Sequence, residues 1–197
     1  MKSGAALSAE IGAAAATVAA SSAALAALLE GIGTGDSADP LREVSEACLD
    51  GLAEVARTES RLAALKGLLT AGYVRSSEAL AGPAANLQDV TVQEMSTVAE
   101  IACVLTVSER SAGALICDSL ALTEVLPLTL AALQGGELSW QHARVMVDEA
   151  ANLDAAGAAA LEAHFLDPDA PNPARGCPAG ELVPGRFRAK ARAWRER

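Results

Sequence analysis

Apolar residues recur along most of this chain at intervals of three, four and seven, which is the spacing of residues on one face of a helix. Within residues 5–30, Ile11, Val18 and Leu25 lie seven residues apart, with Leu28 and Leu29 completing the stripe. This period favours a soluble helix that packs along a seam, although the Ala-rich composition also resembles that of a signal peptide or a membrane span. We therefore expect a first helix over residues 1–30 that does not enter a membrane.

A second stripe predicts one long amphipathic helix from Leu41 to about Tyr73. We expect its buried face to carry the large apolar residues, namely Val44, Cys48, Leu52, Val55, Leu62, Leu65 and Leu69. The Gly-rich segment before it, residues 31–40, reads as a loop, and residues 76–89 read as a connection that contains Gly82 and Pro83. Glycine and proline at these places predict interruptions between helices.

The first half of the central stretch, residues 92–147, has the pattern of a helix-turn-helix. Val98, Ile101, Ala102 and Leu105 give one short helix an apolar face, and Ser108 is a good N-cap for a second helix with Ala112, Leu115, Ile116 and Leu120 inward. In such motifs the first turn of the second helix meets DNA base edges. The candidate contact residues are Ser108, Glu109, Arg110 and Ser111; the alternative is an ordinary capped helix with exposed polar residues.

The second half of the central stretch predicts another pair of helices. Pro127 suits the first turn of a helix over Leu126 to Leu133, Gly135 and Gly136 end it, and Ser139 can cap the next helix. The first turns of that helix carry candidate phosphate contacts, because helix N-termini attract anions. These candidates are Ser139, Gln141, His142 and Arg144; the alternative for His142 and Arg144 is an interhelical hydrogen bond or salt bridge that fixes this helix against the long one.

A further helix is predicted from Asp154, its cap, to Leu166, and residues 167–185 are predicted to form a linker with five prolines. Residues 186–197 then resume helical spacing with a basic character. Residues 184–197 hold six basic residues against Glu196 alone, a net of +5, so the preceding 183 residues carry −15. This tail either faces nucleic acid or docks its two rings, Phe187 and Trp194, on the acidic body; the DNA-contact candidates are Arg186, Arg188, Lys190 and Arg192.

Composition favours an all-α helical bundle with a helix-turn-helix-like centre and a basic C-terminal helix. Hydrophobic residues make up 51% of the 197 residues but aromatics only 3%, so the core must come from closely approaching helices. We divide the chain into a first helix (1–30), a helical domain (40–166), the linker (167–185) and the tail (186–197). The net charge of −10 argues against affinity for nucleic acid over the whole surface.

Four cysteines at positions 48, 103, 117 and 177 form no close pair. We interpret them as reduced, mostly buried thiols of a cytoplasmic protein. The sequence contains no Walker loop, nucleophile elbow or metalloprotease motif, and we expect no catalytic residue, no metal site, no cofactor and no small-molecule substrate.

Three segments together resemble the domain of unknown function 222, the 13E12-repeat family common in actinobacteria. They are AEIACVLTVSERSA, LPLTLAALQGGELSWQHARVMVDEA and VPGRFRAKARAWRER, and the resemblance covers about residues 40–197. Its most specific element is a G-x-[LI]-S-x-x-H-A-R signature, present as Gly136, Leu138, Ser139, His142, Ala143 and Arg144. The central segments are also similar in architecture to the DNA-binding core of chromosome-partition centromere-binding proteins.

The family resemblance implies a DNA-associated region upstream of an HNH endonuclease module. That module needs a pair of metal-binding histidines, whereas the two histidines here lie 22 residues apart. We therefore expect a non-catalytic DNA-associated domain of an HNH-endonuclease-type protein, either the N-terminal region of a longer chain or a shortened member. Related domains carry arginines on the second helix, but residues 111–122 here carry none, which predicts weaker phosphate contact.

The alternative function is a protein-interaction or oligomerisation module without DNA binding. In that case the first two helices pair with a partner, which is either another protein or a second copy of this chain.

Overall fold

The computed structural model describes residues 4–30, 39–83, 86–174 and 181–196, which form eight helices and no strand. The predicted all-α class is confirmed. Most of the loop predicted at residues 31–40 lies outside the described residues. The helices follow one another in chain order as α1 (Gly4–Glu30), α2 (Pro40–Ala81), α3 (Leu87–Leu105), α4 (Glu109–Glu124), α5 (Pro127–Gly135), α6 (Trp140–Ala150), α7 (Ala155–Leu166) and α8 (Pro184–Arg195).

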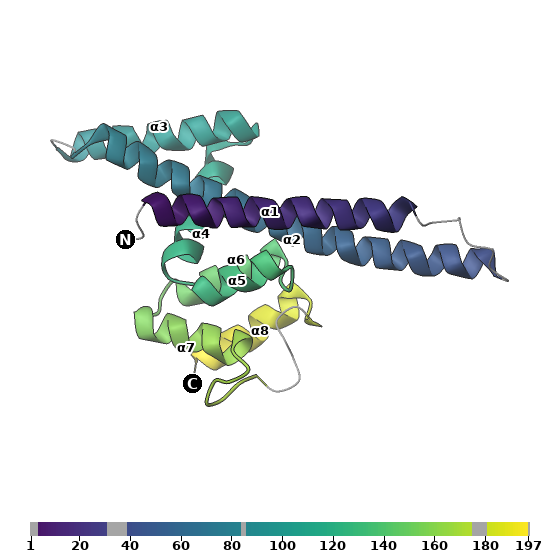
Figure 1. The fold of residues 1–197 in the computed structure, drawn as a ribbon. Coiled ribbons are helices and arrows are strands. Elements are labelled where there is room, and N and C mark those ends of the chain that lie inside the picture. The colour runs from purple at the N-terminus through teal and green to yellow at the C-terminus, as the bar shows by residue number, and fades with distance from the viewer. Residues whose placement is uncertain (1–3, 31–38, 84–85, 175–180, 197) are drawn as a thin grey trace.

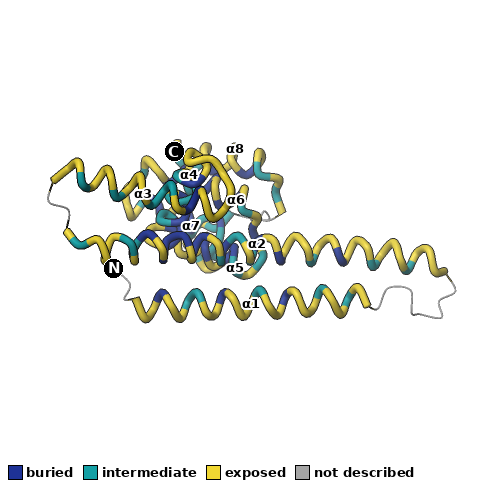
Figure 2. Tube along the Cα trace, turned by 90° about the horizontal axis from the view of Figure 1, so that it is seen from above, coloured by how far each residue is buried: buried dark blue, intermediate teal, exposed yellow. Residues whose placement is uncertain are grey.

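Two long antiparallel helices, α1 and α2, form an arm that projects beyond the rest of the molecule (Figure 1). The other helices gather along the C-terminal half of α2, so that most of α2's N-terminal half contacts only α1 (Figure 2). The predicted seam on α1 is confirmed in part: Ile11, Val18 and Leu25 are half-buried and alternate with the buried Leu7, Ala14 and Ser21, but Leu29, predicted to complete the stripe, is 51% exposed. The two sets alternate at intervals of four and three residues, which is the geometry of coiled-coil packing.

The boundaries of α2 and α3 differ from the prediction. Helix α2 continues through Ser76 to Ala81 and ends at Gly82, whose φ of 71° lies in the left-handed region. Helix α3 begins at Leu87, capped by the side chain of Asn86, so the segment predicted as a connection is mostly helical. The reason is local, since residues 73–81 contain neither glycine nor proline, and the helix continues until Gly82 adopts a left-handed conformation.

The prediction for the buried face of α2 is wrong for six of its seven residues, because Val44 and the five named next are exposed and only Leu65 is half-buried against the core. Leu52, Leu62 and Leu69 are 65%, 48% and 50% exposed, and Val55 and Cys48 are also exposed. Small residues are buried instead, because they let neighbouring helices approach closely. A Cβ added to Gly72 would lie 3.3 Å from Ile11 Cδ1, so at this point α1 packs almost against the backbone of α2.

The main apolar core packs against α2 and joins it to α5, α6, α7 and α8, with a few residues from α1 and α4. Its largest fully buried side chains include Leu68, Leu133, Met146, Leu161 and Phe187. Helix α8, which the sequence separated from the domain as a basic tail, therefore belongs to the same core. A smaller apolar cluster, formed around Val74, Ile101, Ala102 and Ala112, joins α3 and α4 to α2.

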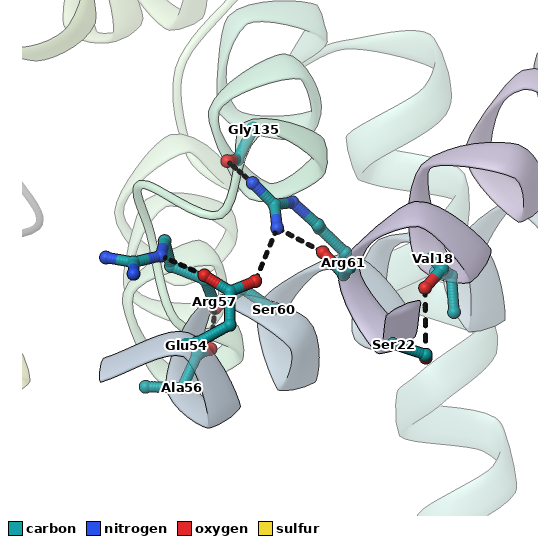
Figure 3. Close-up of polar contacts among 9 residues, drawn as sticks. Val18, Ser22, Glu54, Ala56, Arg57, Ser60, Arg61 and Gly135 are labelled. Atoms are coloured by element: carbon teal, nitrogen blue, oxygen red, sulfur yellow. Dashed lines mark hydrogen bonds and ion pairs between the residues drawn. The ribbon is translucent and has the colours of Figure 1, made fainter. Parts of the chain in front are cut away.

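A polar network fixes the arm to the core at the turn after α5 (Figure 3). Arg61 on α2 donates hydrogen bonds to Ser21 of α1, to Glu54 (3.2 Å) and to the carbonyl of Gly135 (3.0 Å). Arg57 pairs with the same carboxylate at 2.8 Å, and its hydrogen bond is the main reason that the pKa of Glu54 is lowered. One guanidinium thus links three helices, which orients the arm relative to the domain.

Helix α1 is long and apolar enough to cross a membrane, judged by length and composition alone. Helices α3 and α4 meet the same criterion only when they are taken together across a bend of 105°. A helix of a soluble protein or a signal sequence can have these properties too. The cytoplasmic location and the absence of a membrane partner therefore stay predictions.

Candidate functional site

The helix-turn-helix pattern corresponds to a pair of helices with the expected geometry. The axes of α3 and α4 meet at 105°, within the range of helix-turn-helix motifs. Thr106 closes α3 in the left-handed conformation (φ 55°), and the hydroxyl of Ser108 accepts a hydrogen bond from Ser111 N. The predicted cap at Ser108 is confirmed. Glu109, Arg110 and Ser111 are exposed at the tip, as the DNA interpretation requires.

The buried face of α4 extends further around the helix than predicted. Ala112 is buried and Leu115, Ile116 and Leu120 are half-buried, but Asp118, Ser119 and Leu122 are buried as well. The reason is that α4 lies between α3 on one side and α2 with α6 on the other. On α3, by contrast, Leu105 is 38% exposed although it was predicted to face inward.

His142 makes an internal contact, but not the predicted bond to the long helix α2, because its partner Leu182 lies just before α8. It is 6% exposed, and its ring bonds to Ser139 Oγ through Nδ1 (2.7 Å) and to the carbonyl of Leu182 through Nε2. A carbonyl only accepts, so Nε2 carries the hydrogen and Nδ1 accepts from the serine hydroxyl. Ser139 also caps α6, as predicted. His142 thus ties the segment before α8 to α6.

Arg144 also makes an interhelical contact. Its Nε lies 3.3 Å from the carboxylate of Asp118, so its partner is on α4 and not on the long helix α2. Burial raises the pKa of Asp118, with Asp148 adding to the rise and Arg144 opposing it. Gln141 stays exposed. Of the four candidates at the start of α6, Gln141 is therefore the one that is exposed and whose side chain makes no hydrogen bond or ion pair with the described residues.

The basic helix α8 docks on α6, in agreement with the docking interpretation of the tail. Phe187 is fully buried and meets the ring of Phe165 edge-on, with centroids 5.1 Å apart. Arg188 pairs with Asp148 at 2.8 Å, while Arg192 and Arg195 approach Glu149 at 3.8 and 3.0 Å. Arg186 and Lys190 are exposed and have no ion-pair partner in the part of the chain that the structure describes.

The candidate DNA residues therefore separate into two groups. His142, Arg144, Arg188 and Arg192 serve contacts within the protein, and Ser108, Ser111 and Ser139 take part in helix caps. Glu109, Arg110, Gln141, Arg186 and Lys190 are left free to meet a ligand. In addition, α4 carries Asp118 and Glu124 but no basic residue after Arg110. The electrostatic surface available for phosphate contact is small.

A larger candidate surface includes five residues of α2 that the sequence assigned to the core. Eight residues form an exposed apolar band along α2, which we call the outer stripe: Leu41, Cys48, Leu52, Val55, Leu62, Leu69, Tyr73 and Leu80. Their spacing is visible in the sequence, with Leu41, Cys48, Val55, Leu62 and Leu69 seven residues apart. What the sequence does not show is that this band faces away from the chain's own helices.

Near its C-terminal end the outer stripe opens into an apolar groove of about 590 Å³ between α2 and α3. Leu69 and Tyr73 form one wall, and Ile101, Val104 and Leu105 form the other. Val104 is 82% exposed. Stripe and groove together make a mostly apolar surface on a molecule whose net charge is −10.

The cysteines do not behave as predicted. Cys48, Cys103 and Cys117 are all exposed, so the expectation of mostly buried thiols is wrong for the three that the structure describes. Cys48 lies on the outer stripe, and Cys103 lines the groove. In both places the thiol acts as a small apolar group. Within the described residues, no three His, Cys, Asp or Glu side chains gather as a metal site would need.

Comparisons with protein-family models, with curated proteins and with solved structures gave no match. The similarity to the 13E12-repeat family therefore stays a prediction from the quoted segments.

Proposed function

We propose that this chain is a protein-interaction module that binds a helical partner through the outer stripe of α2. The observation that carries the proposal is a band of large apolar residues at strict heptad spacing on a solvent-exposed face. A repeat of seven matches a helix that supercoils with another helix, whereas a straight surface helix has no need of it. Large contiguous apolar patches on a soluble protein mark interaction sites.

Two further features support the proposal. The N-terminal half of α2 extends beyond α3 to α8 (Figure 2). Because the stripe residues on this half are exposed, a partner helix can lie along it without meeting those helices. The network of Arg61, Glu54 and Gly135 holds the arm in a fixed orientation. A rigid, preorganised surface loses less entropy on binding than a flexible one.

Photo-crosslinking in the cell that encodes the protein tests this function. A photoreactive phenylalanine analogue at Leu62, in the middle of the stripe, is expected to give a discrete crosslinked product. The same analogue at Ala53, exposed on α2 but outside the stripe, is the control and should give little. Equal yields from the two positions, or no product from either, would refute an interaction through this surface.

DNA association is a second candidate, supported by the α3–α4 geometry and the exposed tip at Arg110. Fluorescence anisotropy of a labelled random-sequence duplex, titrated at low and moderate salt, tests it. DNA binding predicts affinity that falls steeply with salt and weakens in Arg110→Ala and in the double variant Arg186→Ala, Lys190→Ala. Absence of binding at low salt would exclude this function. Point variants replace deletion of the tail here, because deletion would remove Phe187 from the core.

A further inference from the structure

The outer stripe is interrupted by two exposed charges of opposite sign. The stripe follows two lines of residues along α2, each with a spacing of seven. The first line runs through positions 41, 48, 55, 62 and 69, and the second runs through positions 45, 52, 59, 66, 73 and 80. On this line Glu59 and Lys66 are exposed, and neither has an ion-pair partner among the residues that the structure describes. A helical partner must therefore place a cation beside Glu59 and an anion beside Lys66.

A second copy of α2 satisfies this requirement when it runs antiparallel. In this arrangement a two-fold axis passes near Leu62. A residue of one copy then lies opposite the residue of the other copy for which the two residue numbers add up to 124 or 125. Leu62 then meets its own copy, and Glu59 of each chain lies beside Lys66 of the other. A parallel pair in register would instead place like charges together, which is unfavourable.

The same register also matches the apolar residues. Val55 falls opposite Leu69 of the second copy, and Leu52 falls opposite Tyr73. The N-terminal half of each α2, at Leu52, thereby reaches the apolar groove that Tyr73 and Val104 line in the other copy. Because the axis is two-fold, every contact occurs twice and the assembly closes as a dimer.

We propose that two copies of this chain pair antiparallel through the outer stripe, with Glu59 and Lys66 fixing the register. The inference rests on the proposed interaction function and names its partner. The apolar stripe supplies the affinity, and the two reciprocal ion pairs select the orientation.

The charges allow a test by exchange, using sedimentation velocity over a range of concentrations. The wild-type chain is expected to dimerise. Glu59→Lys or Lys66→Glu alone should weaken the homodimer about tenfold, because each change turns two attractive pairs into repulsive ones. A mixture of the two variants, and the double variant E59K/K66E, should regain wild-type affinity, since opposite charges meet again. Asp50→Lys, a change of the same charge on the same helix outside the stripe, is the matched control.

Orientation is tested separately with a short bis-maleimide in a background with all four native cysteines replaced by serine. Leu62→Cys should crosslink to its own copy. Leu41→Cys should not, because the antiparallel register separates the two copies of residue 41 by about 60 Å at 1.5 Å per residue. Circular dichroism checks that each variant keeps its helices.

Three outcomes overturn the inference. A chain that stays monomeric at every concentration excludes the second copy as partner, while the crosslinking at Leu62 in cells still decides the proposed function. A dimer that ignores the charge reversals, or one in which Leu41→Cys crosslinks as well as Leu62→Cys, excludes the antiparallel register. A dimer that survives Leu62→Glu excludes the outer stripe as its interface.

Discussion

Replacement of Phe187 by alanine tests whether the basic helix α8 is part of the domain or a free tail. Phe187 is fully buried, and it contacts the rings of Phe165 and His142 with centroid separations of 5.1 and 5.7 Å. Removing a buried phenyl ring from a packed core costs about 3–5 kcal/mol, through lost transfer free energy and the cavity left behind. A free tail would lose almost nothing.

The cost is large compared with the total stability of a domain, which is about 5–15 kcal/mol. With a urea m-value of about 1–3 kcal/mol/M, nearer the upper end for a chain of this size, the unfolding midpoint should fall by about 1–2 M. Urea unfolding followed by far-ultraviolet circular dichroism measures this shift. The loss of α8 packing should also remove the burial of Glu149 beneath Arg195.

The adjacent Arg186→Ala is the matched control, because Arg186 is exposed one residue away on the same helix. Its unfolding free energy should stay within about 0.5 kcal/mol of the wild type, as is usual for a surface position. If Phe187→Ala also stayed within this range, the docking of α8 on α6 would be refuted.

Three more substitutions test other contacts. Gly136→Ala should destabilise by about 1–2 kcal/mol or more in urea unfolding, because Gly136 has a φ of 81° and a Cβ there would lie 3.2 Å from the carbonyl oxygen of Arg57; an unchanged midpoint would contradict this packing. Burial raises the pKa of Glu162, whose carboxylate accepts hydrogen bonds from Thr129 N (2.7 Å) and Oγ1 (2.6 Å), so its contribution to stability falls as the pH rises through the raised pKa. Glu162→Gln removes this loss of stability. Between pH 4.5 and 7 the unfolding free energy of the variant should therefore rise more, or fall less, than that of the wild type. Identical pH profiles for the two proteins would contradict a raised pKa at Glu162. Arg144→Ala should cost about 0.5–1 kcal/mol at pH 7 and less near pH 3.5, where Asp118 is protonated and needs no counter-charge; a cost independent of pH would argue that the ion pair contributes nothing.

The sequence by itself determined the helices and most of their ends. Ser108, Ser139 and Asp154 cap the helices that follow them, and Pro127 and Gly136 bound α5 as predicted. These features are local: a cap is a bond between residues three apart, and a left-handed glycine ends a helix whatever surrounds it. Where a predicted boundary was wrong, at residues 76–89, the helix ran on until the first residue that stops it.

Only the tertiary structure decided which faces are covered. The heptad stripe of α2 predicted a buried surface, but the helices of this chain pack on its small residues and leave Leu52, Leu62 and Leu69 exposed. For His142 and the basic tail, the sequence left ligand contact and internal packing open, and the structure placed both in packing roles. The physical reason is the same in each case. A periodic pattern shows that a surface needs a partner, but which partner covers it depends on residues far away in the chain or in another molecule.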